Sequence, residues 1–346
     1  MLHVVIMAGG RGTRFWPASR RKLPKPFLQV TGERTLLQLT VDRVLPLATA
    51  ARVWLVIAAG NIAPAREQLP QLPAENFIGE PQGRNTAPCL AVAAELIRRR
   101  DPEAVLVALP ADHIIEEEEQ FRAMLAAAAA FAVREKRLVT IGIKPRFPHT
   151  GFGYIRTGGQ LAAVQPWPVH AVRQFVEKPD RATAEGYLAA GDYAWNGGMF
   201  IVSAATWLDM VAQHLPALAA ELPGLDAADL APAYARMPAV SIDYGVLEKE
   251  TRLACIPAAL TWSDVGSWTA LYERAGADNA ALGPLWTKDA HGNYFHTPDK
   301  FVAALGVENL IVVDTGDALL VCTRDRAEEV KDIVAHLEQH GPAHLV

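Results

Sequence analysis

The stretch that decides the fold is residues 1–30, MLHVVIMAGGRGTRFWPASRRKLPKPFLQV. It opens with an apolar run, Leu2–Met7, which has the length and β-branched content of a buried parallel strand. Three glycines follow, Gly9, Gly10 and Gly12, and glycine lets another group approach the main chain closely. Successive backbone N–H groups in such a turn can form a concave site for an anion.

Cationic side chains follow these glycines at Arg11, Arg14, Arg20, Arg21, Lys22 and Lys25. Because Pro26 disfavours the helical region for the residue before it, we expect Lys25 on a stiff, extended backbone. A strand, a glycine turn and fixed cations together suit a polyphosphate. The glycine spacing matches neither the dinucleotide fingerprint nor a Walker A loop. The AGG motif alone would equally fit the first turn of any α/β protein.

The composition limits the classes of protein to which this chain can belong. The 346 residues correspond to about two domains, and 51% hydrophobic with 21% charged residues is typical of a folded globular chain. The net charge of −5 argues against non-specific nucleic-acid binding, and no apolar run approaches the length of a membrane span. Without a signal-peptide pattern, and with three scattered cysteines (Cys89, Cys255 and Cys322), we expect a cytoplasmic protein that binds neither nucleic acid nor membrane.

Strand and helix patterns alternate through the first half of the chain, which predicts a doubly wound α/β fold. We expect strands at 2–7, 53–59, 104–109 and 138–143 and helices at 36–45, 87–100 and 116–137. The glutamate run within 116–119 is interpreted as a solvated first helical turn.

From about residue 145 the pattern changes. Strands at 172–176 and 199–202 lack long helices between them, and 211–235 reads as a helical surface pair. From about 279, short apolar runs separated by turn residues predict a small β unit, with 326–339 as a closing helix. The expected domains are therefore 1–275, with halves of about 1–144 and 145–275, and 280–346.

Several polar residues follow strands, where ligands bind in open α/β sheets. Asp112 comes directly after the third strand and Asp264 lies in TWSDVGSW; either could be a metal ligand or only a turn or capping residue. In FVEKP, Glu177 and Lys178 follow a strand, and adjacent residues on a strand face opposite ways, so we do not expect them simply to pair; the alternative is an ordinary ion pair at the surface. Asn196, in WNGGMF, can donate and accept hydrogen bonds to a hydroxyl pair.

The string AGGRGTRFWPASRRKLPKPFL resembles the N-terminal signature of the sugar nucleotidyltransferases, and within them it is most similar to the mannose-1-phosphate guanylyltransferases. EPQGRNTAP (residues 80–88), PADHII, FVEKP, WNGGMF, SIDYGVLEK and TWSDVGSW match further family segments in order. Pro26 departs from the family, which usually has glutamine there. The resemblance implies a Rossmann-like mixed sheet of the GT-A-like kind, with a nucleotide half, a sugar half and the small C-terminal β unit.

The resemblance also implies roles for individual residues. Catalytic roles fall to Arg14, Lys25 and Lys178. Nucleotide binding falls to Ala8, Gly9, Gly10, Gly12, Thr13, Arg14, Lys25, Glu80, Arg84, Asn85 and Asp112. Sugar binding falls to Gly153, Glu177, Lys178, Asn196 and Asp243, although Asp243 could equally serve only to order Tyr244. Asp112 and Asp264 would hold Mg²⁺.

The implied reaction joins GTP and mannose 1-phosphate into GDP-mannose and pyrophosphate. The resemblance further suggests a homodimer, and the chain length suggests a single activity without an additional isomerase domain. Two rivals remain: the same chemistry on glucose 1-phosphate with dTTP or UTP, and a non-catalytic nucleotide-sugar sensor with this fold.

Overall fold

The computed structural model describes residues 1–346, which form two compact units. The first, here called the sheet unit, comprises residues 1–9, 38–111 and 115–262. The second, here called the coil unit, comprises residues 10–37, 112–114 and 263–346. The glycine-rich stretch therefore leaves the sheet unit at Gly9 and belongs mostly to the coil unit.

A nine-stranded sheet forms the centre of the sheet unit, in the order β3-β2-β1-β4-β9-β6-β10-β8-β7. Its strands are β1 (Leu2–Met7), β2 (Val53–Ala58), β3 (Phe77–Glu80), β4 (Val105–Pro110), β6 (Leu138–Ile143), β7 (Gly153–Val164), β8 (Trp167–Glu177), β9 (Tyr193–Ser203) and β10 (Leu253–Ala258). β1 pairs in parallel with β2 and β4, whereas β9 runs antiparallel to β4 and β6. The predicted mixed sheet is confirmed.

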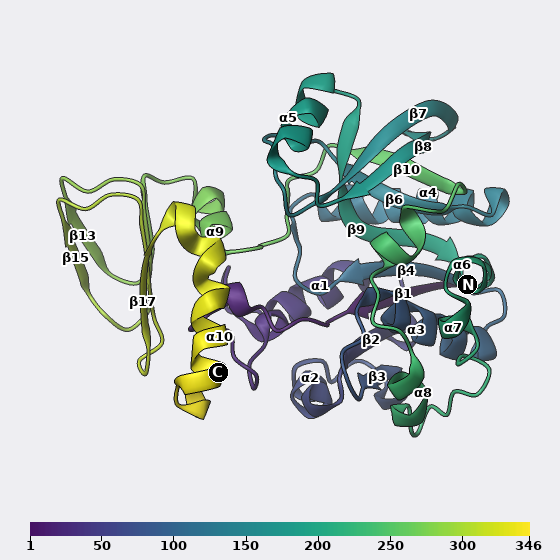
Figure 1. Ribbon diagram of the computed structural model, residues 1–346, viewed down its shortest axis with the longest axis horizontal. Helices are drawn as coiled ribbons and strands as arrows, with labels where there is room; N and C mark the ends of the chain where they lie inside the picture. Colours follow the sequence, from purple (N-terminus) through teal and green to yellow (C-terminus); the bar gives the residue numbers. More distant parts are fainter. The chain divides into compact units, whose positions relative to one another are not determined.

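Helices cover both faces of this sheet. Every residue of β1 after Leu2 is buried, and Val5 and Met7 share a core with α3. Helix α4 packs against β4, β6 and β9, and it lies on the other side of β4 from α3 (Figure 1). The helices are α1 (Leu36–Val44), α2 (Ile62–Gln68), α3 (Thr86–Arg100), α4 (Glu118–Glu135), α5 (Arg181–Ala190), α6 (Ala204–His214), α7 (Pro216–Ala219) and α8 (Ala231–Arg236). The doubly wound prediction is confirmed.

The middle of the chain corrects three predictions. The expected helical surface pair at 211–235 is wrong, because the chain there forms the end of α6, the short α7 and α8 with a non-helical stretch between. Prolines interrupt this region, and Val211, Leu218 and Tyr234 are fully buried rather than on the surface. The ten-residue α5 does separate β8 from β9. The long hairpin of β7 and β8 also extends well beyond the predicted strand at 172–176.

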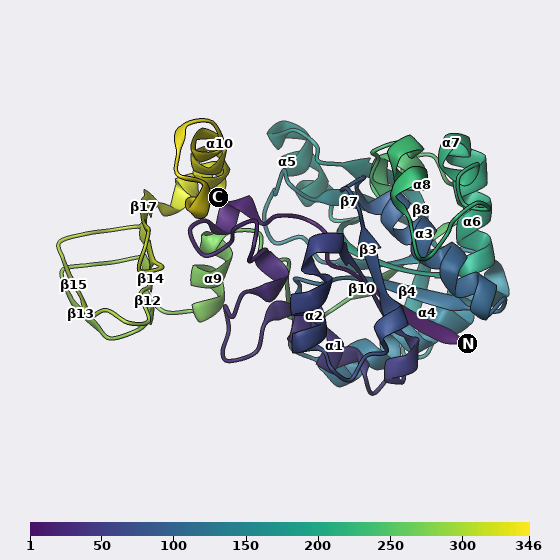
Figure 2. The same ribbon diagram turned by 90° about the horizontal axis from the view of Figure 1, so that it is seen from below.

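The coil unit contains short, mostly parallel strands (Figure 2). They are β12 (Asn279–Leu282), β13 (Leu285–Lys288), β14 (Asn293–His296), β15 (Val302–Leu305), β16 (Leu310–Asp314) and β17 (Leu319–Thr323). Helix α9 (Trp268–Ala275) precedes them, and a 3₁₀ turn, η7 (Arg324–Glu329), leads into α10 (Val330–His340). The expected closing helix is therefore present from Val330.

The segment 10–37 packs with the coil unit because its large apolar side chains enter that core. Phe15 and Trp16 join a buried cluster with Trp268 and Val334, and the Trp268 indole N–H donates to the main-chain oxygen of Trp16. This segment carries two 3₁₀ turns, η1 (Thr13–Phe15) and η2 (Lys25–Phe27). The chain also forms short strands β5 (Ile114–Ile115) and β11 (Trp262–Ser263). None of the helices is both long and apolar enough to span a membrane.

Candidate functional site

The glycine turn adopts backbone conformations that other residues avoid. Gly10 and Gly12 have positive φ, 94° and 65°, where a side chain would be strained. A Cβ on Gly12 would also overlap the Cβ of Lys25. Gly12 is therefore required twice, for its own conformation and for the approach of Lys25.

Lys25 lies between the two aspartates predicted as metal ligands. Its Nζ donates to the Asp112 carboxylate at 2.7 Å and to the main-chain oxygen of Asp264 at 2.8 Å. Lys25 is buried although it is charged. We call Lys25, Asp112 and Asp264 the lysine cluster. The expectation of an extended backbone at Lys25 is wrong, because Lys25 begins the turn η2, whose Leu28 N–H donates to the Lys25 oxygen.

The two acids of the lysine cluster titrate differently. Burial would raise the pKa of Asp112, but Lys25 and His113 hold that pKa below its usual range. Burial raises the pKa of Asp264 to about 6; Lys25 opposes the rise, and the neighbouring Asp112 and Glu328 add to it. The cluster thus holds more negative charge than one lysine neutralises, which favours the binding of a further cation.

The arginines of the glycine-rich stretch pair with acids from the end of the chain. Arg14 Nε lies 2.7 Å from a carboxylate oxygen of Glu328. Arg11 and Arg21 both contact Glu338, at 2.6 and 3.0 Å. Arg14 and Glu328 are each about half exposed, with side-chain exposures of 44% and 50%. Exposed pairs of this kind are weak, so a phosphate group can replace Glu328 at Arg14.

The segment 80–86 of the sheet unit holds its polar groups by internal contacts. Glu80, at the end of β3, is buried and accepts a hydrogen bond from the Tyr234 hydroxyl at 3.3 Å. Arg84 donates to the Ala235 main-chain oxygen at 3.0 Å. Asn85 has a φ of 69° and accepts from the Thr86 N–H at the start of α3. In this structure Asn85 therefore caps a helix.

Ala8 and Gly9 continue from β1 toward this segment. The Ala8 N–H donates to the main-chain oxygen of Val56 at 2.8 Å, which fixes the exit of the strand. A Cβ on Gly9 would lie 3.9 Å from a carboxylate oxygen of Glu80. Gly9 and Glu80 are thus neighbours. Thr13 begins the turn η1 in the coil unit.

The predicted sugar-binding residues meet in the sheet unit. Asn196 Nδ2 donates to the Asp243 carboxylate at 3.0 Å, while its Oδ1 accepts from the Thr140 hydroxyl at 2.9 Å. A Cβ on Gly153 would lie 2.6 Å from a Glu177 carboxylate oxygen and 3.3 Å from the Asn196 Cβ. We call Glu177, Lys178, Asn196 and Asp243 the asparagine cluster.

The prediction that Glu177 and Lys178 do not pair is wrong, because Lys178 Nζ lies 3.1 Å from a Glu177 carboxylate oxygen. Lys178 follows the end of β8 and has a φ of 47°. This left-handed conformation removes the strand alternation on which the prediction rested. The lysine is half exposed, with a side-chain exposure of 55%, so its ammonium group is accessible to an anion.

Both acids of the asparagine cluster hold protons more tightly than usual. Burial raises the pKa of Glu177 to about 7; Asp243 adds to this rise, and Lys178 opposes it. Burial also raises the pKa of Asp243, although Lys178 and Ser241 oppose it. Clustered carboxyls beside an amide and an ammonium group suit a ligand that carries both hydroxyls and a phosphate.

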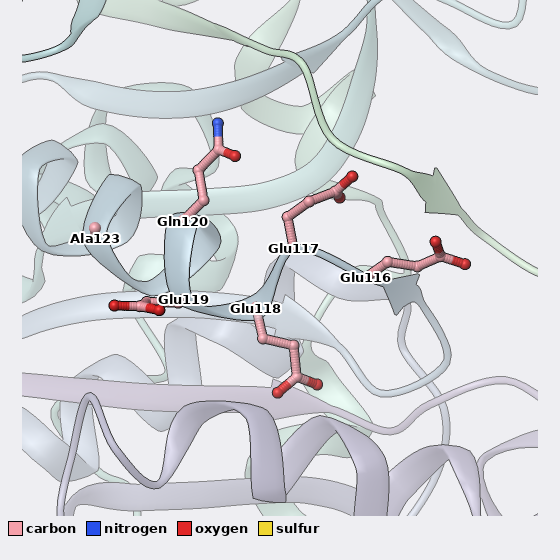
Figure 3. Close-up of a pocket in the computed structure, with 6 residues that line it drawn as sticks. All are labelled: Glu116, Glu117, Glu118, Glu119, Gln120 and Ala123. Carbon is pink, nitrogen blue, oxygen red and sulfur yellow. The ribbon is translucent and has the colours of Figure 1, made fainter.

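An open hollow of about 740 Å³ lies beside the start of α4, lined by Glu116, Glu117, Glu118, Glu119, Gln120 and Ala123. Its four carboxylates point away from one another (Figure 3), and Glu117 is bound to Thr261 through both the N–H and the hydroxyl. A hollow lined by glutamates repels phosphates. The helix begins at Glu118, so the interpretation as a first turn applies to Glu118 and Glu119 only.

Sequence reasoning missed four residues that contact the predicted set: Thr140, Tyr234, Glu248 and Glu328. Glu248 accepts from the Glu177 N–H at 3.2 Å. Each of the four lies far along the chain from its partner, so only the strand register and the helix packing bring them together. Of the four, only Glu248 lies in a segment singled out from the sequence, SIDYGVLEK, and nothing in that string indicates its contact with Glu177.

Both parts of the chain resemble known proteins. A family model described as nucleotidyl transferase matches residues 3–280, and one described as MannoseP isomerase/GMP-like beta-helix domain matches residues 287–337. The xanthan biosynthesis protein XanB of Xanthomonas campestris pv. campestris (strain B100) is 42% identical, over 97% of this chain and 73% of that protein. A mannose-1-phosphate guanylyltransferase of Klebsiella pneumoniae is 40% identical, over 98% of this chain and 74% of that protein.

A solved structure from Thermus thermophilus, described as a mannose-1-phosphate geranyltransferase, superposes with a TM-score of 0.90. It is 37% identical, and the match covers 97% of this chain and 99% of that one. The match includes both the sheet unit and the coil unit. Within the coil unit, residues 287–337 match the β-helix domain model.

Proposed function

This chain belongs to the nucleotidyl transferase family, and from that premise we propose that it transfers GMP from GTP to mannose 1-phosphate. The products are GDP-mannose and pyrophosphate. The observation that carries the proposal is the lysine cluster, in which the buried Lys25 lies against Gly12 of the glycine turn and donates to the Asp112 carboxylate and to the main-chain oxygen of Asp264. Relatives at about 40% identity whose printed name is mannose-1-phosphate guanylyltransferase support the choice of substrates.

In this proposal an oxygen of the sugar phosphate attacks the α-phosphorus of GTP in line, and pyrophosphate leaves with the electrons of the broken P–O bond. Such a transfer depends on positioning and charge stabilisation rather than on a covalent enzyme intermediate. Arg14 and Lys25 offset the charge of the triphosphate, together with the backbone of residues 8–13. Lys178 binds and aligns the attacking phosphate.

The remaining groups supply recognition. Glu80, Arg84 and Asn85 contact the base and the ribose. Glu177, Asn196 and Asp243 bind hydroxyls of the sugar, and Gly153 leaves room for the sugar beside them. The raised pKa of Glu177, about 7, means that this carboxyl can donate or accept a hydrogen bond near neutral pH.

Members of this family generally use a divalent metal ion, and we propose Mg²⁺ held by Asp112 and Asp264. The donor set fits, because Mg²⁺ usually takes one or two carboxylates and fills its other positions with water and phosphate oxygens. The raised pKa of Asp264 supports this, since a bound cation would relieve the crowding of acids. When bound, the ion neutralises and orients phosphate oxygens.

We also propose a homodimer that works in the cytoplasm. Exposed large apolar side chains in the coil unit, among them Trp286, Phe301 and Leu305, support association through that unit. Analytical ultracentrifugation of the full chain tests the dimer: a single monomeric species at micromolar concentration would contradict it.

Pyrophosphate release tests the proposed reaction. The purified protein with Mg²⁺ is assayed against four nucleoside triphosphates and several sugar 1-phosphates, and we expect the highest kcat/KM for GTP with mannose 1-phosphate. A maximum for dTTP or UTP with glucose 1-phosphate would support the same type of reaction but contradict the proposed recognition of guanine. GTP binding without release from any pair would indicate a nucleotide-sugar sensor.

A further inference from the structure

One segment of the sheet unit makes hydrogen bonds to four residues of loop 80–87. We call residues 234–243 the strap; it runs from α8 to the start of the π-helical turn η6 (Asp243–Leu247). Its hydrogen bonds to the loop join Tyr234 to Glu80, Ala235 and Val240 to Arg84, Val240 to Ala87, and Ile242 to Thr86, at 2.9–3.3 Å. The loop's position therefore depends on the strap.

The contact at Glu80 differs from the others because it joins two side chains in the interior. Tyr234 is fully buried and Glu80 is 6% exposed. The Tyr234 hydroxyl donates to Oε1 of Glu80, while Oε2 faces Gly9. One hydrogen bond thus fixes the carboxylate, and a carboxylate held in place presents its oxygens in a defined direction.

A fixed carboxylate can discriminate between nucleobases. Guanine presents a ring N–H and an amino group side by side, and both can donate to one carboxylate. Adenine and uracil do not offer this pair of adjacent donors. A site built to accept such hydrogen bonds rejects bases that lack them far more strongly than an apolar pocket rejects a change of size.

We propose that Tyr234 is a positioning residue for nucleotide selectivity, acting by holding the carboxylate of Glu80 in the orientation that accepts hydrogen bonds from guanine. The inference rests on the proposed role of Glu80 at the base. It assigns to the strap a function in selectivity rather than in the chemical step. Tyr234 itself does not touch the reacting phosphates.

The titration of Glu80 allows the positioning role of Tyr234 to be distinguished from a role in packing alone. Burial raises the pKa of Glu80 to about 7, and the hydrogen bond from Tyr234 opposes that rise. The titratable side chains that face Glu80 are Tyr234 from α8 and Cys89 from α3, and burial raises the pKa of each. Neither ionises near neutral pH, so Glu80 alone among the three titrates there.

The KM for GTP should depend on pH in a defined direction. The ionised carboxylate is the better acceptor, so this KM should fall as pH rises through about 7. Loss of the Tyr234 hydroxyl removes a group that favours the ionised form. In Tyr234→Phe the midpoint of this fall should therefore move to higher pH.

The experiment measures kcat and KM for GTP and UTP between pH 5.5 and 9 in wild type, Tyr234→Phe and the control Tyr193→Phe. Tyr193 is in the same unit, and its hydroxyl donates to Gln174 at 3.2 Å. For Tyr234→Phe we expect about a tenfold rise in the KM for GTP, a matching loss of selectivity over UTP, a higher midpoint and nearly unchanged kcat. The triphosphate also titrates in this range, but equally in all variants.

Two further variants keep the inference testable if Tyr234→Phe does not fold. Replacement of Tyr234 by 3-fluorotyrosine keeps the shape and strengthens the donor, so the midpoint should move to lower pH. Glu80→Gln removes the titrating group, so the corresponding pH dependence should vanish along with selectivity. A pH profile that is the same as that of wild type in both Tyr234 variants would overturn the positioning role.

The roles of Glu80 and Tyr234 can fail separately. If Glu80→Gln keeps wild-type selectivity and pH dependence, the proposed role of Glu80 at the base is wrong. If Glu80→Gln loses both while the Tyr234 variants keep both, only the positioning role of Tyr234 is wrong.

Discussion

The lysine cluster and the asparagine cluster handle charge in different ways. In the coil unit, Lys25 and Arg14 are already paired with acids, Asp112 and Glu328. In the sheet unit, Asn196 is fixed between Thr140 and Asp243 by hydrogen bonds. Lys178 is about half exposed and pairs only with the adjacent Glu177. If the substrates bind as proposed, Lys25 and Arg14 exchange carboxylates from distant parts of the chain for phosphates, whereas the hydrogen bonds that fix Asn196 are already formed before a ligand arrives.

The largest expected effect comes from the lysine cluster. Lys25→Ala and Asp264→Ala should each lower kcat by about 10²–10³-fold, because each removes a preorganised charge from the triphosphate site. Steady-state pyrophosphate release measures this, and circular dichroism verifies the fold. Lys22→Ala, an exposed lysine of the same segment, is the matched control. Near-normal turnover in both cluster variants would contradict the site assignment.

Two glycine-to-alanine substitutions in β7 test whether the asparagine cluster binds the sugar. Gly153→Ala places a methyl group 2.6 Å from a Glu177 oxygen, whereas Gly159→Ala on the same strand meets nothing within 4 Å. Because overpacking typically costs about 1–3 kcal/mol, Gly153→Ala should lower kcat/KM for mannose 1-phosphate by about tenfold or more. Gly159→Ala should leave that ratio unchanged. Equal ratios for the two variants would remove Gly153 from the sugar site.

The dependence of folding stability on pH tests the role of Glu250, which lies just after η6. Glu250 is buried and accepts hydrogen bonds from Arg252 and from two main-chain N–H groups. Burial would raise its pKa, but these donors and His214 lower it to about 2. A depressed pKa stabilises the fold above the unfolded value, about 4.5, and this stabilisation is lost as pH falls from there toward 2.

Glu250→Gln should therefore lower the free energy of unfolding by about 1.5–3 kcal/mol at pH 7, and the difference from wild type should shrink below pH 4.5. Urea unfolding at several pH values measures this difference. Glu221→Gln removes an acid from a pair with Arg236 at the surface and should lower stability much less than Glu250→Gln does. A Glu250 difference that stays constant down to pH 3 would show that the carboxylate does not act through its charge.

The smallest effect concerns the exchange of partners at Arg14. Glu328→Gln removes the acid that occupies Arg14, so the KM for GTP should fall by about two- to fivefold while stability changes little. Glu329→Gln is the control, since Glu329 is equally exposed, at 51%, and pairs with Arg326 within the same turn. A higher KM in Glu328→Gln would mean that Glu328 orients Arg14 rather than competes for it.

Sequence patterns predicted the fold well where elements are local. Every residue of β1 and β6 lies where periodicity placed it, because short apolar runs bounded by turn residues allow few alternatives. The prediction of a helical surface pair at 211–235 was wrong, since tertiary packing buries Leu218 and Tyr234 in the core of the sheet unit, where Tyr234 contacts Glu80 of β3. Propensity alone carries no information about such burial.

The candidate site was predictable only as a set of motifs. The motifs singled out Asp112, Asp264 and Asn196 as candidates, but they did not show that Glu177 and Lys178 pair, because that depends on one residue with positive φ. They also did not reveal Tyr234 or Glu328. These residues become neighbours of the predicted set through contacts that span more than 150 residues of chain.

The most direct test of separate nucleotide and sugar regions compares KM values for both substrates in Arg14→Ala and Lys178→Ala. We predict that Arg14→Ala raises the KM for GTP by about tenfold or more and leaves that for mannose 1-phosphate nearly unchanged. Lys178→Ala should do the reverse. If each variant raises both KM values to the same extent, the assignment of separate regions to the two substrates is wrong.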